Sequence, residues 1–204
     1  MRKPLTYTHQ SQFLEMTKDV VDTVKLSRLV QDDIAVAKRN YSEGDIINYI
    51  DISSIDSVGK RFSVTTQYEF AKAPSRAQQC IEKGDILYST VRPNLRNYGI
   101  VNSDAPNLVA SSGFCVLRPK DGYYEYVFAI ISSDTFTAKM VDKAQGGVFP
   151  AVNQTFVLDQ DVPLPDKRVI QHLSEIVRQA DKSKFELRKA ISAIDEVIKS
   201  LING

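Results

Sequence analysis

Between residues 60 and 97 the chain gathers side chains that could bind nucleic acid. Residues 60–96 hold seven basic and three acidic residues, a local net charge of +4 on a chain whose net charge is +1. Arginine, asparagine and glutamine make paired hydrogen bonds to base edges, and arginine and lysine also contact phosphates. The candidate contacts are Lys60, Arg61, Lys72, Arg76, Arg92, Asn94, Arg96 and Asn97. An ordinary solvated basic surface would have the same composition, so this pattern alone leaves both interpretations open.

Two loops are expected to present such side chains. Residues 92–97 read Arg-Pro-Asn-Leu-Arg-Asn directly after a predicted strand, and their proline and asparagines are typical of a loop. Recognition residues usually stand on loops of a rigid scaffold. The second candidate loop contains Gln145, Gly146 and Gly147, where glycine would let the backbone approach a ligand closely. A simple turn after a helix is the alternative for this segment.

The common catalytic motifs are missing from the sequence. It contains no GxGxxG, GxxxxGK[ST] or HExxH and no Asn/Asp-Pro-Pro-Tyr/Phe tetrapeptide. Neither His9 nor His172 has a nucleophile or a carboxylate at a recognisable spacing. Cys80 and Cys115 form no CxxC pattern, which argues against a structural metal and for reduced thiols in a cytoplasmic protein. We therefore expect a binding module without catalytic or metal-ligating residues, rather than an enzyme.

Short apolar runs bounded by Gly, Pro, Asn or Asp predict a domain dominated by strands. A strand followed by a helical turn is expected from residue 24, and further extended segments at 46–52, 86–91, 99–101, 114–117 and 156–158. Two of these runs follow Gly-Asp pairs, Gly44-Asp45 and Gly84-Asp85, which we interpret as turns feeding strands. Helical apolar spacing covers residues 123–141, and residues 1–23 are consistent with one short helix.

One unbroken heptad stripe runs through the last 35 residues. Its spacings alternate three and four through Ile170, Leu173, Val177, Ala180, Lys184, Leu187, Ile191, Ile194, Ile198 and Leu201. A period of 3.5 residues with charged flanks is typical of a coiled coil, so the helix is expected to pair with one other helix. The alternative is a helix that lies on its own domain. Pro163 and Pro165 precede this helix and are expected to stop regular strand pairing there, and Asp166 is the predicted N-cap.

Membrane and export signals are also missing. No apolar run approaches the roughly 18 residues that a membrane-spanning helix needs, and the first ten residues, MRKPLTYTHQ, lack the apolar core of a signal peptide. We expect a cytoplasmic protein with no membrane partner.

Four segments then follow one another in a recognisable order before the heptad helix. They are GDILYSTVRP at 84–93, ASSGFCVLRP at 110–119, GGVFPAVN at 146–153 and VPLP at 162–165. Together with the helix they resemble the specificity (S) subunit of Type I restriction–modification systems. The resemblance covers residues from about 24 to 204, and it is the order of the segments, not any single one, that makes it specific.

The resemblance implies an α+β fold with a mixed, largely irregular β target-recognition domain at 24–165. An N-terminal segment, 1–23, would precede this domain, and a coiled-coil spacer helix, 166–204, would follow it. It also implies double-stranded DNA as the ligand, with methyltransferase (M) and restriction (R) subunits as partners. No cofactor is expected on this chain, because S-adenosylmethionine, ATP and magnesium would be bound by the partner subunits.

A full S subunit has two domain-plus-helix halves whose helices pair antiparallel, whereas this chain holds one half. It is either a natural half-subunit or a fragment of a longer one. In the first case we expect an antiparallel homodimer through Leu173, Val177, Ala180, Leu187, Ile191, Ile194, Ile198 and Leu201. The alternative function is a non-catalytic coiled-coil adaptor whose globular domain binds protein.

Overall fold

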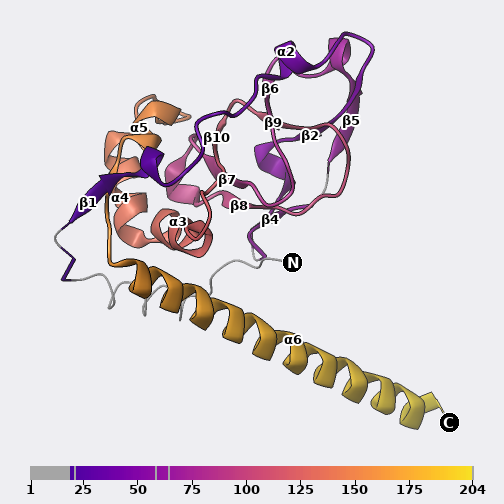
Figure 1. Ribbon diagram of the computed structural model, residues 1–204. Coiled ribbons are helices and arrows are strands. Elements are labelled where there is room, and N and C mark those ends of the chain that lie inside the picture. Colours follow the sequence, from indigo (N-terminus) through magenta and orange to yellow (C-terminus); the bar gives the residue numbers. More distant parts are fainter. Residues whose placement is uncertain (1–18, 21, 58, 64, 204) are drawn as a thin grey trace.

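The computed structural model describes residues 19, 20, 22–57, 59–63 and 65–203, without the side chains of 181, 184, 185, 188 and 197–203. Three layers form the body of the molecule: a four-stranded sheet, a five-stranded sheet and a group of helices (Figure 1). One long helix runs away from this body. The expected α+β class is confirmed, whereas the short helix expected within residues 1–23 falls almost wholly outside the described residues.

A five-stranded mixed sheet occupies the middle layer. Its spatial order is β10 (Phe114–Leu117), β7 (Ile86–Ser89), β8 (Tyr98–Val101), β4 (Arg61–Phe62) and β3 (Ile55–Asp56). β8 and β4 run parallel, and the other neighbours run antiparallel. The strands expected at 99–101 and 114–117 are confirmed. The strand expected at 86–91 ends at Ser89, because the N–H and the hydroxyl of Thr90 both donate to the Gly113 carbonyl at 2.9 Å.

A four-stranded sheet forms the second layer. Its order is β5 (Thr66–Glu69), β2 (Ile46–Ile50), β9 (Leu108–Ser111) and β6 (Ala77–Cys80), with β2 and β9 parallel. The strand expected at 46–52 stops at Ile50, because Asp51 caps a 3-10 turn, η2 (Ile52–Ser54). Its carboxylate accepts the Ile52 N–H at 2.7 Å. A short helix, α2 (Ala37–Asn40), and the 3-10 turn η3 (Phe70–Lys72) lie beside this sheet.

Alternation of side chains along the strands explains the layering. In β7, Leu87 joins the apolar core between the two sheets, whereas Ile86 and Tyr88 join the core on the helical side. Phe114 and Cys115 of β10 divide in the same way. The middle sheet is therefore buried on both faces, which is why its strands read as continuous apolar runs in the sequence.

Two consecutive helices cover the outer face of the middle sheet. α3 (Tyr124–Ser132) and α4 (Asp134–Lys143) confirm the helical spacing at 123–141 and are separated at Ser133. The Ser133 hydroxyl accepts the Phe136 N–H at 3.1 Å and so caps α4. The Phe136 ring in turn meets Tyr88 of β7 edge-on, with ring centroids 5.5 Å apart, which joins the helical layer to the sheet.

Two sequence-based expectations about residues 153–165 were wrong. Residues 156–158, expected to be extended, belong to α5 (Gln154–Leu158), because the Asn153 side chain caps that helix by accepting the Phe156 N–H at 2.6 Å. Regular pairing also persists where two prolines were expected to stop it. β11 (Asp161–Pro163) pairs antiparallel with β1 (Thr23–Lys25), ahead of the predicted helical turn η1 (Leu26–Arg28). Pro163 is tolerated because this two-stranded sheet consists only of edges.

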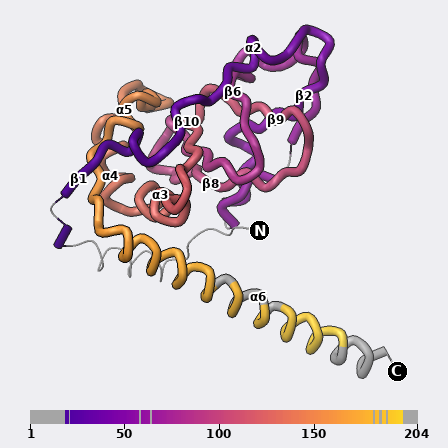
Figure 2. The backbone as a smooth tube through the Cα atoms, viewed as in Figure 1, coloured from indigo at the N-terminus to yellow at the C-terminus, as the bar shows by residue number. Residues whose placement is uncertain are grey.

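The long helix, α6 (Lys167–Asn203), spans 37 residues. The predicted N-cap is confirmed, since the Asp166 carboxylate accepts the Arg168 N–H at 2.7 Å. Ile170, Leu173 and Val177 are buried in the core that also contains α3. Beyond them the helix leaves the domain (Figures 1 and 2).

The first two turns of the heptad stripe therefore cover the chain's own domain, as in the alternative that the sequence left open. Leu173 and Val177, expected in a dimer seam, are corrected to intrachain core residues, because α3 already occupies their faces. Ser174 adds a polar tie, donating from its hydroxyl to the Glu125 carboxylate at 3.1 Å.

Candidate nucleic-acid interface

The two loops expected to carry recognition residues lie against each other. The first contains the 3-10 turn η4 (Pro93–Leu95), and the second spans residues 145–150. The Arg92 N–H donates to the Pro150 carbonyl at 2.8 Å, and its Nη2 donates to the Val148 carbonyl at 3.2 Å. The guanidinium also sits 4.3 Å from the centre of the Phe149 ring, in a cation–π contact. Loops that are about 50 residues apart in the sequence thus form one surface.

The second loop is closed at its base. Gln145 and Ala151 exchange both backbone hydrogen bonds, at 3.0 and 2.8 Å. Gly146 stands at φ +113°, a conformation that favours glycine, and an added Cβ would lie 3.2 Å from the Phe149 carbonyl oxygen. The expected loop at Gln145–Gly147 is therefore present, with residues 146–150 between the two paired residues and a fixed base.

Three basic residues near this surface have left-handed backbone conformations. Lys60, Arg92 and Arg96 have φ values of 49°, 50° and 52°. Such values cost free energy for residues with a Cβ, and they persist where the surrounding structure imposes them, often at functional sites. Beside Lys60 the packing is tight: Gly99 lies so close to the Lys60 backbone that a Cβ on Gly99 would meet the Lys60 carbonyl at 2.7 Å.

Contacts among these residues fix Lys60 and Arg96. The Lys60 ammonium donates to the Arg96 carbonyl at 2.9 Å and lies 4.6 Å from the centre of the Tyr98 ring. Burial, and then repulsion from the Arg96 guanidinium, lower the pKa of Lys60. Arg96 itself pairs with Asp134 at the start of α4. Lys60 is thus tied to the first loop rather than extended into solvent.

Two of the remaining predicted contacts, Arg76 and Lys72, are held by different parts of the fold. Arg76 is exposed, and its backbone leads toward the first loop: its carbonyl accepts the Ser112 N–H at 2.8 Å, and the carbonyl of the next residue, Gly113, accepts the Thr90 N–H. Lys72 is not brought to this surface. It pairs with Glu69 in a turn whose backbone bonds to residues 43 and 45, before the start of β2.

Three further predicted residues have mixed positions. Asn94 is exposed at the tip of η4. Asn97 is half-buried, and its carbonyl accepts the Ser89 N–H at 2.8 Å. Arg61 lies within β4, and its buried Nε makes no hydrogen bond. Of these three, only Asn94 has its side chain fully available to a ligand.

Two exposed apolar residues of the surface were not among the predicted contacts. Val148 is 76% exposed and Phe149 63% exposed. The signal was present in the sequence, since two bulky apolar residues directly after a Gly-Gly pair cannot both be covered by a short loop. The surface is defined here as the loop surface: residues 92–97 and 145–150 with Lys60 and Arg76.

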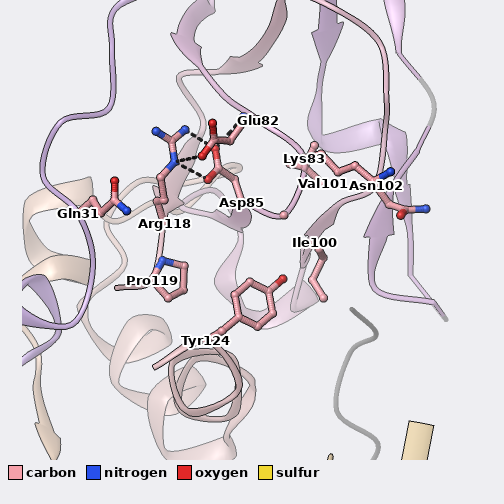
Figure 3. A pocket seen from close by; sticks show the side chains of 11 residues that line it. Gln31, Glu82, Lys83, Asp85, Ile100, Val101, Asn102, Arg118, Pro119 and Tyr124 are labelled. Atoms are coloured by element: carbon pink, nitrogen blue, oxygen red, sulfur yellow. Dashed lines mark hydrogen bonds and ion pairs between the residues drawn. The ribbon is translucent and has the colours of Figure 1, made fainter. Parts of the chain in front are cut away.

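A hollow of about 430 Å³ opens elsewhere, beside the turn that feeds β7 (Figure 3). Arg118 crosses its wall and donates to both carboxylate oxygens of Asp85 at 2.8 Å, with Glu82 at 3.0 Å. The hydrogen bonds with Asp85 raise the pKa of Arg118. The Asp85 carboxylate also accepts the Glu82 N–H at 2.9 Å, so its role is structural.

The other Gly-Asp turn has the same hydrogen bond from the residue three positions earlier: the Asp45 carboxylate accepts the Ser42 N–H at 2.7 Å. Both pairs are turns feeding strands, as expected. Within the described part of the chain no group of histidine, cysteine and acidic side chains could hold a metal ion. His172 is exposed, with Nδ1 3.9 Å from the Glu175 carboxylate.

The distal part of α6 carries an exposed apolar stripe. Leu187, Ile191 and Ile194 are 62%, 50% and 57% exposed, and Ala180 is half-buried. The side chains of Ile198 and Leu201 are not described. Among the described residues no helix is long and apolar enough to cross a membrane.

Comparisons with known proteins find similar proteins both by sequence and by fold. The specificity subunit of the Type I restriction enzyme HindI from Haemophilus influenzae is 29% identical over 162 residues, which cover 77% of this chain and 35% of that protein. The HsdS subunit from Thermoanaerobacter tengcongensis matches with a TM-score of 0.66 and 28% identity, over 83% of this chain and 43% of that one. No protein-family model matches.

A second solved structure, described as showing complex assembly and conformational transition of the type I R-M system, matches with a TM-score of 0.62 and 28% identity. That match covers 82% of this chain and 45% of that one. The chain thus spans less than half the length of the relatives it matches. Over that span it is a homologue of Type I specificity subunits and shares their fold.

Proposed function

We propose that this chain recognises a DNA sequence as the specificity component of a Type I restriction–modification enzyme. The observation that carries the proposal is the similarity to specificity subunits in both sequence and fold over about four fifths of the chain. The loop surface supports it independently. It joins Arg92, Arg96 and Asn94, which are side chains of the types that read base edges and hold phosphates.

The proposal leaves catalysis to other subunits. This chain would position methyltransferase (M) subunits, which bind S-adenosylmethionine, and restriction (R) subunits, which use ATP and magnesium, on a bipartite site. The sequence contains none of the catalytic motifs that such chemistry uses. Purified chain supplied with S-adenosylmethionine, ATP and magnesium is expected neither to methylate nor to cut DNA, and added M subunit is expected to restore adenine methylation.

The exposed stripe on α6 supports pairing with a second helix. Leu187, Ile191 and Ile194 present a seam to solvent over the distal part of the helix. In a half-length subunit the partner would be a second copy in antiparallel orientation, and two identical domains would read a palindromic split site. In a fragment, the partner would be the second helix of the longer chain. Either arrangement places the seam beyond Val177, because the earlier turns are buried against α3.

The test is methylome sequencing of cells that carry this chain with its M subunit, paired with a duplex-binding assay on the purified chain. We expect methylated adenines in one bipartite sequence and salt-dependent binding to a duplex that contains it. The alternative, an adaptor that binds protein through the globular domain, is not favoured by the comparisons. It would be supported instead if the chain bound no duplex at low salt and its loss left the methylome unchanged.

A further inference from the structure

Val148 and Phe149 form an apolar tip on a loop that the fold holds in place. They are the two most exposed large apolar side chains in the described part of the chain. The base of their loop is closed by the two backbone hydrogen bonds between Gln145 and Ala151, and the Pro150 carbonyl accepts the Arg92 N–H. An apolar side chain that stays in water adds little to folding stability, so Val148 and Phe149 are available to contact a ligand.

Arg92 covers one face of this tip without being neutralised. Its guanidinium lies 4.3 Å from the centre of the Phe149 ring and donates to a carbonyl, and no described carboxylate forms an ion pair with it. Its backbone is left-handed, at φ 50° and ψ 61°. A positive charge that rests on an aromatic ring is available to a stronger anionic partner, because a phosphate binds a guanidinium through paired charged hydrogen bonds.

We infer that the Phe149 ring inserts between DNA bases, while the Arg92 guanidinium leaves that ring and binds a neighbouring phosphate. The inference rests on the DNA-recognition function proposed above. DNA offers an aromatic face and an anion within one nucleotide, which matches the pair of groups that Phe149 and Arg92 present. An apolar protein surface would leave the charge of Arg92 without a partner and so fits the tip less well.

Arg92 and Phe149 both exchange contacts within the protein for contacts with DNA in this arrangement. Arg92 gives up the ring and the Val148 carbonyl and gains phosphate oxygens. Phe149 gives up the guanidinium and gains the faces of the bases, with Val148 beside it at the edge of the stack. The closed base of the loop keeps the tip in place, so no refolding of residues 145–151 is needed.

The experiment uses the full chain and a duplex that the wild-type protein selects from a random-sequence pool. 2-Aminopurine, whose fluorescence rises when it is unstacked, replaces successive bases of that duplex. We expect a fluorescence rise at one step with the wild type, no rise with Phe149→Ala, and a Kd for Phe149→Ala that is about 5- to 150-fold weaker. Phe149→Trp should keep both properties. Ile46→Ala, which trims an exposed apolar residue at the start of β2, is the matched control and should behave as wild type.

The outcomes separate this inference from the proposed function. If the wild type selects no duplex, the proposed DNA recognition and the stacking role of Phe149 are both wrong. If the wild type and Phe149→Ala bind the selected duplex equally and give the same 2-aminopurine signal, DNA recognition stands and the stacking role is wrong, which would assign the tip to a protein contact. Loss of the signal in Phe149→Ala, with Ile46→Ala unchanged, supports the stacking role.

Discussion

Asp85 receives two hydrogen bonds from Arg118, each 2.8 Å long, and this pair joins the start of β7 to the residue after β10. The Asp85 side chain is 1% exposed and that of Arg118 20% exposed. Both residues lie in segments that resemble the specificity-subunit pattern, Gly84–Pro93 and Ala110–Pro119. The two segments therefore share a structural role, because the ion pair between them joins the neighbouring strands β7 and β10 of the middle sheet.

Breaking this pair should destabilise the fold. Asp85→Asn leaves the guanidinium with only the exposed Glu82 carboxylate, and losing one partner of a buried ion pair costs about 3 kcal/mol. Urea denaturation measures the change in the free energy of unfolding. Lys83→Ala is the control, because its partner Asp104 is 82% exposed, and an exposed pair contributes at most about 1 kcal/mol. Equal effects of the two substitutions would contradict the structural role of Asp85.

Local patterns in the sequence predicted much of the fold. The runs at 99–101 and 114–117 could be recognised because the middle sheet is buried on both faces, so each strand is a continuous apolar segment. The cap at Asp166 followed from the residue type alone. α5 could not be recognised, because its five residues are too few for a helical period to show. Asn153 was its only sequence signal.

The candidate site was only partly predictable, because tertiary contacts decide where a basic side chain points. Nothing local distinguishes Lys72, which pairs with Glu69 outside the loop surface, from Arg76, which is counted in it. The contact between residues 92 and 149 joins two loops through neighbouring backbone bridges, and one sequence cannot reveal such a pairing. The heptad stripe showed a helix but not the point, after Val177, where it leaves its own domain.

Removing the charge of Arg96 should weaken DNA binding. If Arg96 reads a guanine, Arg96→Ala costs about 1–3 kcal/mol on the target duplex and little on random duplex. If it contacts a phosphate, binding to all sequences weakens and the slope of log K against log salt flattens by about one. Fluorescence anisotropy at several salt concentrations measures both quantities. Lys72→Ala is the control and should match wild type, because Lys72 pairs with Glu69 in the turn before β2. Wild-type behaviour of Arg96→Ala would remove Arg96 from the interface.

Stability should fall in alkaline solution, because buried groups resist ionisation. Burial raises the pKa of the Cys115 thiol from 9.0 to about 12, and burial likewise raises the pKa values of Tyr88 and Tyr126. Between pH 9 and 12 the unfolded chain therefore holds fewer protons than the folded chain, so the free energy of unfolding decreases as the pH rises. Each fully shifted group contributes about 1.4 kcal/mol per pH unit in its window.

Cys115→Val isolates the share of the thiol in this alkaline decrease. A buried thiol behaves as a small apolar side chain, so valine should retain folding while removing one titrating group. Urea midpoints at pH 8, 9 and 10 should decline less steeply than those of wild type. Leu117→Val, in the same strand, should lower stability by a similar amount at every pH. Parallel curves for wild type and Cys115→Val would contradict the assignment.

The distal stripe of α6 should control association while the proximal stripe controls folding. Ile191 is half exposed and lies about 21 Å along the helix beyond Val177, so Ile191→Asp should leave folding intact but place a charge in any helix–helix seam and weaken the pair. Leu173→Ala should instead cost about 2–5 kcal/mol of folding stability, since Leu173 is buried against α3. Analytical ultracentrifugation at tens of micromolar should show a wild-type dimer and an Ile191→Asp monomer. Gln179→Asp adds the same charge away from the stripe and should remain dimeric. A wild-type monomer unchanged by Ile191→Asp would mean that the stripe serves a helix of another chain.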